Sequence, residues 1–197
     1  MWRAGSPILR CHDSRFGATE FNARRDVSLR FRPFTSRGRT VPTLYGSDEL
    51  TGALSETLFH LAPPGGGARR VRFTRLVPYV TSTLAPRRDL RLVDLRDVAL
   101  TSSRYGLTRA DLVESPAAVY PDTARWASAY FHSAAAPDGL VWNARQDRGA
   151  LALVLFGRGR VDRRDLVVVE APLPLAAGDG YLRALEAADR MGVTIVH

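Results

Sequence analysis

Four residues in the first third of the chain have side chains that could bind an anion and stabilise a positive charge. Arg10, Arg30, Tyr45 and Glu56 follow one another at intervals of 20, 15 and 11 residues. A guanidinium group presents a planar pair of donors that fits phosphate oxygens, and a carboxylate stabilises a developing cation. The sequence contains no Gly-x-Ser-x-Gly, His-Glu-x-x-His, Walker or Gly-x-Gly-x-x-Gly motif. The common serine, zinc and nucleotide-loop chemistries are therefore disfavoured.

Glu56 falls on a predicted helix that follows a short predicted strand at residues 41–46. Ser47 is expected to cap this helix by accepting from its free amides. The apolar residues recur at helical spacing until Pro63: Leu50, Ala53, Leu54, Leu58 and Leu61. Glu56 lies about 200° around the helix from Leu54. The pattern therefore turns Glu56 toward solvent or a cleft, and from the helix alone a solvated glutamate is the simpler interpretation.

The segment around this helix resembles a known protein family. Residues 41–57 (VPTLYGSDELTGALSET) resemble the central motif of RES-domain proteins, which are named for arginine, glutamate and serine. Leu9-Arg10 is similar to the first arginine motif of that family, and residues 30–33 (RFRP) to the second. Residues 138–142 (DGLVW) are similar to its late aspartate/glycine strand. Together these motifs span residues 8–156.

The resemblance implies an enzyme that degrades NAD. The family includes toxins of toxin–antitoxin pairs that consume NAD, on a fold similar to that of ADP-ribosyltransferase toxins. Either phosphate or water accepts the ADP-ribosyl group, so the expected reaction is phosphorolysis or hydrolysis. NAD is then the substrate and inorganic phosphate a co-substrate in the first case; no cofactor or metal is expected. The implied partner is an antitoxin with a helix-turn-helix domain of the Xre type, which occludes the cleft.

The same resemblance implies roles for single residues. Glu56 would contact the nicotinamide ribose and stabilise its oxocarbenium-like transition state. Arg10 and Arg30 would hold the diphosphate or an incoming phosphate; without the motif, either is ordinary surface charge. Tyr45 would stack on nicotinamide and reach the ribose, or else be a half-buried strand aromatic. Ser47 is a candidate ligand contact as well as the expected helix cap.

The chain departs from the family pattern after the aspartate/glycine strand. Many relatives carry a serine there, whereas residues 142–146 of this chain read WNARQ, with Ala144 and no hydroxyl. Asn143 could supply a replacement hydrogen bond and Arg145 another anion contact. Cys11 also replaces a tyrosine that follows the first arginine in some members. These differences leave open an altered activity.

Two other functions remain open. The same site could transfer ADP-ribose to a macromolecule, or the chain could be a non-catalytic module that binds nucleic acid through its basic surface. The net charge of +8 and the pI near 10.6 favour a polyanion partner. All basic residues are arginine, however, and their clusters are short, dispersed and not interleaved with aromatic residues. This pattern is more typical of a solvated basic surface.

Length and composition predict one α+β domain over residues 1–197. Hydrophobic residues make up 45% and charged residues 24%, as in ordinary globular proteins. No stretch approaches the roughly 18 apolar residues of a membrane span, and no secretory signal is present, so we expect a cytoplasmic protein. The single cysteine and four scattered histidines give no disulfide and no metal-ligand spacing.

A central mixed or antiparallel sheet flanked by helices is expected. Strands are predicted at residues 8–11, 41–46, 70–80, 90–95, 140–143, 150–156, 166–170 and 193–196. Those at 140–143, 150–156 and 166–170 are expected in the centre of the sheet. Besides the helix after Ser47, one helix is predicted from Pro121 and one amphipathic helix ends at Gly192, with Tyr181, Leu182, Leu185, Ala188 and Met191 as its apolar residues. Residues 157–197 carry no motif and are expected to complete the sheet and contact a partner.

Overall fold

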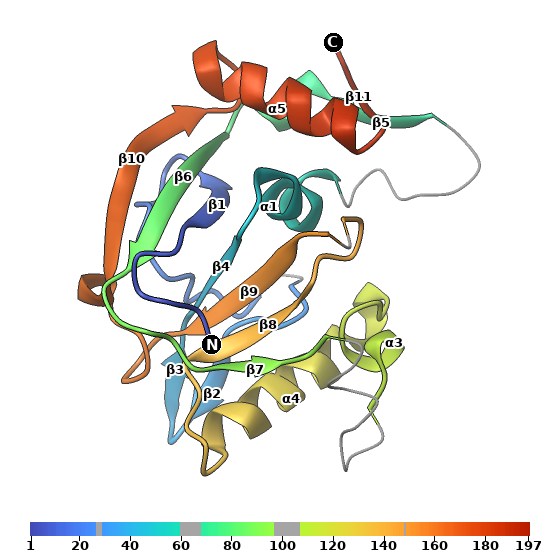
Figure 1. Cartoon of the computed structure of the whole chain (residues 1–197). Helices are drawn as coiled ribbons and strands as arrows, with labels where there is room; N and C mark the ends of the chain where they lie inside the picture. Colours follow the sequence, from blue (N-terminus) through green and yellow to red (C-terminus); the bar gives the residue numbers. More distant parts are fainter. Residues whose placement is uncertain (27–28, 60–67, 97–106, 148) are drawn as a thin grey trace.

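A seven-stranded sheet forms the centre of the molecule (Figure 1). The computed structural model describes residues 1–26, 29–59, 68–96, 107–147 and 149–197. In order across the sheet, the strands are β10 (Leu166–Pro174), β6 (Tyr79–Pro86), β1 (Ile8–Asp13), β4 (Thr43–Ser47), β9 (Leu151–Phe156), β8 (Gly139–Asn143) and β7 (Leu92–Asp94). Strands β7 and β8 pair in parallel, and the other neighbours are antiparallel. The predicted α+β class with a mixed central sheet is confirmed.

Two small sheets and several helices surround the central sheet. One pairs β2 (Phe34–Ser36) with β3 (Arg39–Val41), and the other pairs β5 (Arg69–Arg72) with β11 (Val193–Val196). The α-helices are α1 (Leu50–Thr57), α3 (Arg109–Leu112), α4 (Tyr120–His132) and α5 (Gly178–Arg190); short 3-10 turns lie at Phe73–Arg75, Ala117–Val119 and Arg163–Asp165. Among these described helices, none is long and apolar enough to cross a membrane.

The two faces of the central sheet are covered differently. Helix α4 and the β2–β3 hairpin cover one face, where edge-to-face aromatic contacts join Phe34 to Phe131 and Phe156. The other face is covered by the N-terminal residues and by the connection around Val161, with Trp2 packed into that cluster. A third cluster joins α1 to α5 and the β5–β11 pair. Alternate residues of β8 and β9 point to opposite clusters, as expected for strands buried on both faces.

The helix that carries Glu56 begins later and ends earlier than predicted. Ser47 pairs with Ala152 of β9 and is the last residue of β4, so the prediction that it caps the helix is wrong. The N-cap is Glu49, whose side chain makes no capping bond; its amide instead donates to Ser47 Oγ at 3.2 Å. The helix ends at Thr57. The predicted continuation past residue 60 lies outside the described residues.

Ser47 is part of a close contact between α1 and the sheet. A Cβ atom on Gly52 would lie 2.2 Å from Ser47 Oγ and 2.8 Å from the Cβ of Ala150. Only glycine lets the first turn of the helix approach the end of β4 this closely. The glycine at position 52 therefore helps to set the distance between the sheet and the helix that carries Glu56.

Three further predictions are corrected. The strand predicted at residues 166–170 is longer and lies at the edge of the sheet, because it pairs only with β6 and its register shifts twice. The residues predicted as strand at 70–80 form β5, a 3-10 turn and the start of β6. In α5, Leu182 and Leu185 are 58% and 37% exposed, because the helix packs through its small residues, Gly180, Ala184, Ala187 and Ala188. The predicted helix end is confirmed: Gly192 follows α5 with φ of 63°.

Candidate active site

A cavity of about 580 Å³ lies where β1, β4 and α1 meet residues 16–24 and 29–30. Its lining includes Arg10, Arg30, Tyr45 and Glu56. The structure therefore brings together the four residues that come from separate parts of the chain. Tyr79, Tyr120 and Arg145 extend the wall from later elements.

Each of these side chains is placed by its local element. Arg10 and His12 lie on one face of β1, which alternates buried and half-buried residues. Tyr45 is at the middle of β4. Glu56 lies on α1, away from Leu54 and Leu58, which are buried against α5. The predicted orientation of Glu56 toward a cleft agrees with this placement.

Arg10 is a buried cation with a partly satisfied guanidinium. The residue is 8% exposed, and its Nη1 donates to the carbonyls of Gly17 at 3.2 Å and Ala18 at 2.5 Å. Burial lowers the pKa of the Arg10 guanidinium to about 10, which leaves it charged at neutral pH. Among the described residues no carboxylate lies within ion-pair distance of it, and the charge of Glu20, which also lines the cavity, acts on it from farther away. Its charge is therefore available to an anion in the cavity.

Arg30 and Glu56 face each other across the cavity wall. Arg30 Nη1 lies 3.6 Å from Glu56 Oε2, with the two side chains 5% and 15% exposed. This separation is too long for a well-formed hydrogen bond. The guanidinium also lies over the ring of Tyr120, 5.3 Å from its centroid. Arg30 Nε is buried without a hydrogen-bond partner.

Glu56 is fixed from its other side by a backbone amide. Arg145 N donates to Glu56 Oε1 at 2.9 Å. One carboxylate oxygen thus faces a guanidinium and the other accepts from an N–H. This arrangement holds negative charge at a defined place in the cavity wall.

Tyr45 holds the backbone beside Arg30. Its hydroxyl accepts from Phe31 N at 2.8 Å, and its ring contacts Trp142 edge to face at 6.1 Å. Burial raises the pKa of the Tyr45 phenol above its usual range. The hydroxyl keeps its own hydrogen for donation to a ligand. A direct role for Tyr45 and a role in placing Arg30 are compatible in this geometry.

Ser47 and Asn143 are not part of the cavity lining. Ser47 is fully buried beneath α1. Asn143 ends β8 and is half-buried. Their roles as ligand contacts stay predictions. Ala144, where the family serine was sought, is fully buried in the core beside α4, whereas the following residue, Arg145, lines the cavity.

The cavity residues that were not singled out from the sequence include Thr43, Tyr120 and His12. Thr43 is buried with its Oγ1 unpartnered. Tyr120 starts α4 and supports Arg30. His12 bonds Ser82 Oγ through Nε2 at 2.9 Å, and burial followed by the charge of Arg10 lowers its pKa. His12 and Thr43 had a usable signal, since each lies two residues from Arg10 or Tyr45 in the same strand and so shares its face.

The charge of the site comes from arginine and carboxylate groups. Within the described ranges, His, Cys, Asp and Glu side chains form no group of three or more that could hold a metal ion. Cys11 lines the cavity, and burial raises the pKa of its thiol to about 12. It is therefore a poor nucleophile at neutral pH.

Comparison with known proteins indicates the family of the chain. A family model described as the RES domain matches residues 2–176. No curated protein and no solved structure matched the chain. The matched span extends beyond residues 8–156, where the sequence motifs lie, and it contains all four residues of the cavity wall and the Asp138-Gly139 pair. The chain belongs to the RES-domain family.

Proposed function

We propose that this protein binds NAD⁺ in the cavity and cleaves its nicotinamide–ribose bond, so that cellular NAD is depleted. The observation that carries this proposal is the meeting of Arg10, Arg30, Tyr45 and Glu56 in one cavity. A volume of about 580 Å³ falls within the usual range of small-molecule sites. The lining combines cationic, aromatic and anionic groups, as the diphosphate, the rings and the developing ribosyl cation of this substrate require.

The arginines suit the diphosphate. Arg10 is a buried cation without a carboxylate partner among the described residues, and a bound phosphate would compensate its charge. Arg145 adds a further guanidinium at the cavity wall. Guanidinium groups bind phosphate oxygens through paired donors, which also fixes the orientation of the bound molecule.

Two buried polar atoms in the cavity wall lack a partner: Arg30 Nε and Thr43 Oγ1. Leaving a buried donor unsatisfied costs about 1–3 kcal/mol, so native proteins do so rarely. Both atoms belong to residues that line the same cavity. A substrate with many acceptor oxygens, such as a dinucleotide, would offer partners to both residues after a small side-chain adjustment.

Glu56 is placed to support bond cleavage. When the C1′–N bond breaks, its electron pair goes to nicotinamide, which leaves neutral, and positive charge develops on the ribose. A carboxylate held by Arg30 and by the Arg145 amide stabilises that charge without having to reorient during the reaction. Phosphate or water then forms the new C1′–O bond and loses a proton.

The biological setting is part of the same proposal. An NAD-depleting enzyme harms its own cell unless it is inhibited, and the family resemblance implies a helix-turn-helix antitoxin that covers the cleft. Phe16 and Arg24 are exposed residues of the cavity lining, and such a partner would cover them. Because both NAD and such an antitoxin are cytoplasmic, we place this activity in the cytoplasm.

The test is incubation of the purified protein with NAD⁺, with and without inorganic phosphate, while nicotinamide and the ribosyl product are measured. Glu56→Gln should lower turnover by about a hundredfold or more. Glu49→Gln is the matched control, because it removes an exposed carboxylate at the start of the same helix, outside the cavity lining. Loss of NAD only with phosphate identifies a phosphorylase, and loss without phosphate a glycohydrolase.

Two results would contradict NAD depletion as the function. Transfer of labelled ADP-ribose to a protein or nucleic acid would instead show an ADP-ribosyltransferase. Salt-dependent binding of DNA or RNA by a folded protein that leaves NAD intact would show a nucleic-acid module.

A further inference from the structure

The segment after β8 brings a backbone donor to Glu56. Arg145 N donates to Glu56 Oε1 at 2.9 Å, so the carboxylate depends on where this segment lies. One residue earlier, Ala144 N donates to Ala150 O at 2.9 Å and closes the segment into a loop. The side chain that follows Arg145 adds a contact to a distant part of the chain.

Gln146 ties this loop to the C-terminal part of the chain. Arg69 of β5 donates through Nη2 to Gln146 Oε1 and through Nη1 to Met191 O, the latter at 2.6 Å. Met191 is the C-cap of α5. Arg69 is also held along its backbone, because it pairs with Val193 of β11. The two terminal nitrogens of the Arg69 guanidinium thus link the loop to the end of α5.

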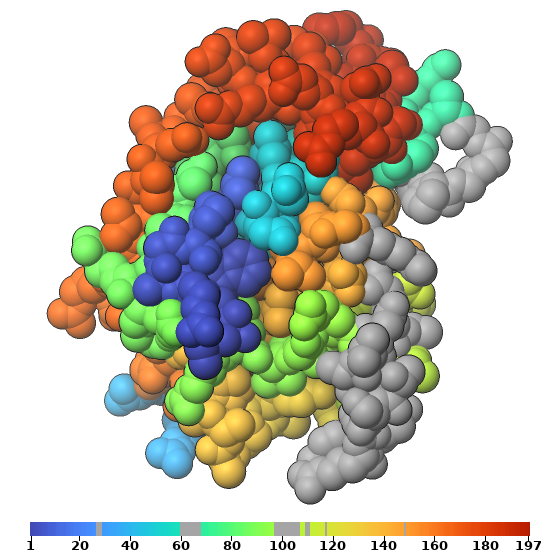
Figure 2. Space-filling view, viewed as in Figure 1, coloured from blue at the N-terminus to red at the C-terminus, as the bar shows by residue number. Residues whose placement is uncertain are grey.

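The same C-terminal part supports the helix that carries Glu56. Leu54 and Leu58 of α1 pack in one cluster with Ala184, Ala187 and Ala188 of α5. Figure 2 shows the red C-terminal residues in contact with the cyan residues of α1. Helix α5 and strand β11 lie beyond residue 176, where the match to the RES domain ends.

We propose that Arg69 and Gln146 are positioning residues for Glu56, and that residues 178–196 are a structural support of the catalytic carboxylate in this chain. The expected effect on kinetics rests on the proposed function. The contacts themselves are independent of that function. If Gln146 is released, the Arg145 amide moves away from Glu56 Oε1, and the carboxylate is free to turn toward Arg30. A displacement of about 1 Å at a reacting centre lowers a rate by up to about a hundredfold.

The kinetic experiment compares two variants at one position. Gln146→Leu keeps the approximate size but removes the acceptor for Arg69, whereas Gln146→Glu keeps an acceptor oxygen. We expect Gln146→Leu to lower kcat for NAD⁺ cleavage about ten- to a hundredfold with KM changed less than about twofold. Gln146→Glu should restore most of kcat. Arg70→Ala, an exposed neighbour of Arg69 on β5, is the matched control and should leave both parameters unchanged.

A second comparison tests whether Gln146 acts through Glu56. In a Glu56→Gln background, Gln146→Leu should cause little further loss, because two residues that act on one group are not additive. Additive losses would overturn the inference. So would equal effects of Gln146→Leu and Gln146→Glu, or a loss that appears in KM alone.

A readout without substrate separates this inference from the proposed function. Hydrogen exchange of the Arg145 amide, followed by NMR in the free protein, should be slow in the wild type and in Gln146→Glu and faster in Gln146→Leu. If the wild type does not cleave NAD⁺, the proposed function fails while this result still supports the positioning contact. Unchanged exchange in Gln146→Leu would overturn the positioning contact even if NAD⁺ is cleaved.

Discussion

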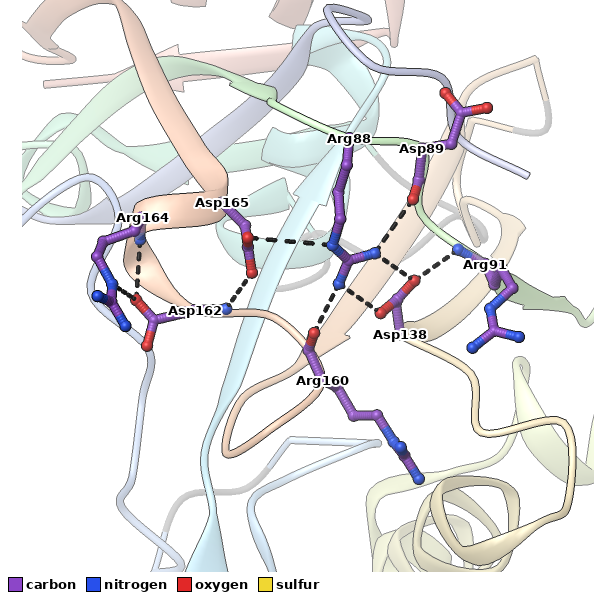
Figure 3. Close-up of polar contacts among 8 residues, drawn as sticks. All are labelled: Arg88, Asp89, Arg91, Asp138, Arg160, Asp162, Arg164 and Asp165. Atoms are coloured by element: carbon purple, nitrogen blue, oxygen red, sulfur yellow. Dashed lines mark hydrogen bonds and ion pairs between the residues drawn. The ribbon is translucent and has the colours of Figure 1, made fainter.

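Two contacts between an arginine and a largely buried carboxylate stand out among the described residues, and they are built in opposite ways. Asp138, 6% exposed in its side chain, accepts from both terminal nitrogens of Arg88 at 2.8 and 3.0 Å and from Arg91 N at 2.7 Å. Arg88 also donates to the carbonyls of Asp89 and Arg160 (Figure 3). Its Nε faces Asp165 at 4.0 Å. This cluster, which we call the Asp138 clasp, has nearly every donor and acceptor used.

The pair in the cavity leaves bonding capacity unused. Arg30 and Glu56 approach only to 3.6 Å, and Arg30 Nε has no partner. The Asp138 clasp joins the connection before β7, the start of β8 and the connection before β10. Glu56 and Arg145 lie near the other end of β8, a five-residue strand about 17 Å long. The saturated contacts fasten the fold, and under the proposed function the unsaturated contacts of the cavity are kept for a ligand.

The aspartate of the family motif therefore has a structural task in this chain, and so does the glycine beside it. A Cβ on Gly139 would lie 2.0 Å from the carbonyl oxygen of Val154 in β9. Glycine is required for the close approach of β8 to β9. The Asp138-Gly139 pair thus begins a central strand, and the residues at the end of that strand reach the cavity.

The largest expected effect breaks the Asp138 clasp. Asp138→Ala should lower the free energy of unfolding by about 3 kcal/mol, because it removes a buried carboxylate and leaves the Arg91 amide without its acceptor. The rate of NAD⁺ cleavage per folded molecule should stay the same as in the wild type. Urea unfolding monitored by fluorescence gives the first quantity. Asp189→Ala, which removes an exposed carboxylate near the end of α5, is the control. A variant as stable as the wild type but inactive would reverse the assignment of the two regions.

For a change at Arg30 we expect a loss of activity with little loss of stability. Arg30→Lys keeps the charge but loses the planar fork, so kcat/KM should fall about ten- to a hundredfold. The free energy of unfolding should change by less than about 1 kcal/mol, because the ion pair it alters is long and one donor is already unsatisfied. Steady-state kinetics and denaturant unfolding on the same sample measure both. A large loss of stability would show that Arg30 belongs with the structural contacts.

The two regions should also respond differently to high pH. Burial lowers the pKa of Arg10 to about 10, whereas hydrogen bonds to Asp138 raise the pKa of Arg88 above its ordinary value. Above pH 10, free Arg10 loses its charge, and affinity for ADP-ribose should fall by up to about tenfold per pH unit. Arg88 keeps its charge in this window, because its pKa is raised. Calorimetric titrations from about pH 8 to about pH 11 measure the affinity, and a flat profile through pH 10 would contradict the role of Arg10.

Loss of the Arg10 charge at high pH should weaken ligand binding but increase the stability of the fold. Because the pKa of Arg10 is lower in the folded than in the unfolded chain, burying its charge costs stability below pH 10. That cost disappears as the pH rises from about 10 toward the ordinary pKa of arginine. Arg10 should therefore contribute to binding at neutral pH while opposing folding.

The smallest effect concerns the family serine. Ala144 is fully buried in the core, so Ala144→Ser would bury a hydroxyl and should cost about 1 kcal/mol of unfolding free energy. NAD⁺ cleavage should not increase, because Glu56 is already held by the Arg145 amide. Unfolding and activity assays on the variant check both. A clear gain of activity would show that a side-chain hydroxyl is missing from this site.

Local sequence patterns predicted where the helices and strands lie better than they predicted which residues contact one another. The spacing of apolar residues located α4, α5 and most strands, and the orientation of Glu56 followed from the helical angle to Leu54. The 3.6 Å approach of Arg30 to Glu56 depends instead on how β4, α1 and the segment before β2 pack together. That packing involves residues far apart in the chain, which short-range periodicity does not describe.

The missed features share this cause. Ser47 has the residue type of a helix cap, but its pairing with Ala152 of β9 outweighs that local preference. Arg69 and Gln146 are 77 residues apart, so nothing in either local segment indicates their contact. Sequence motifs found the residues of the cavity wall, and the contacts that support them became visible only in three dimensions.

Strand β10 closes one side of the sheet and pairs only with β6. A free strand edge is a template onto which another chain can add a strand, and such growth leads to aggregation. Here Pro172 and Pro174 lack the amide hydrogen needed for a continuous ladder, and the two register shifts bend the edge out of line. The exposed Glu170 adds a charge there. The outer strand is therefore protected against sheet extension, which lets the exposed valines at positions 168 and 169 remain in contact with water.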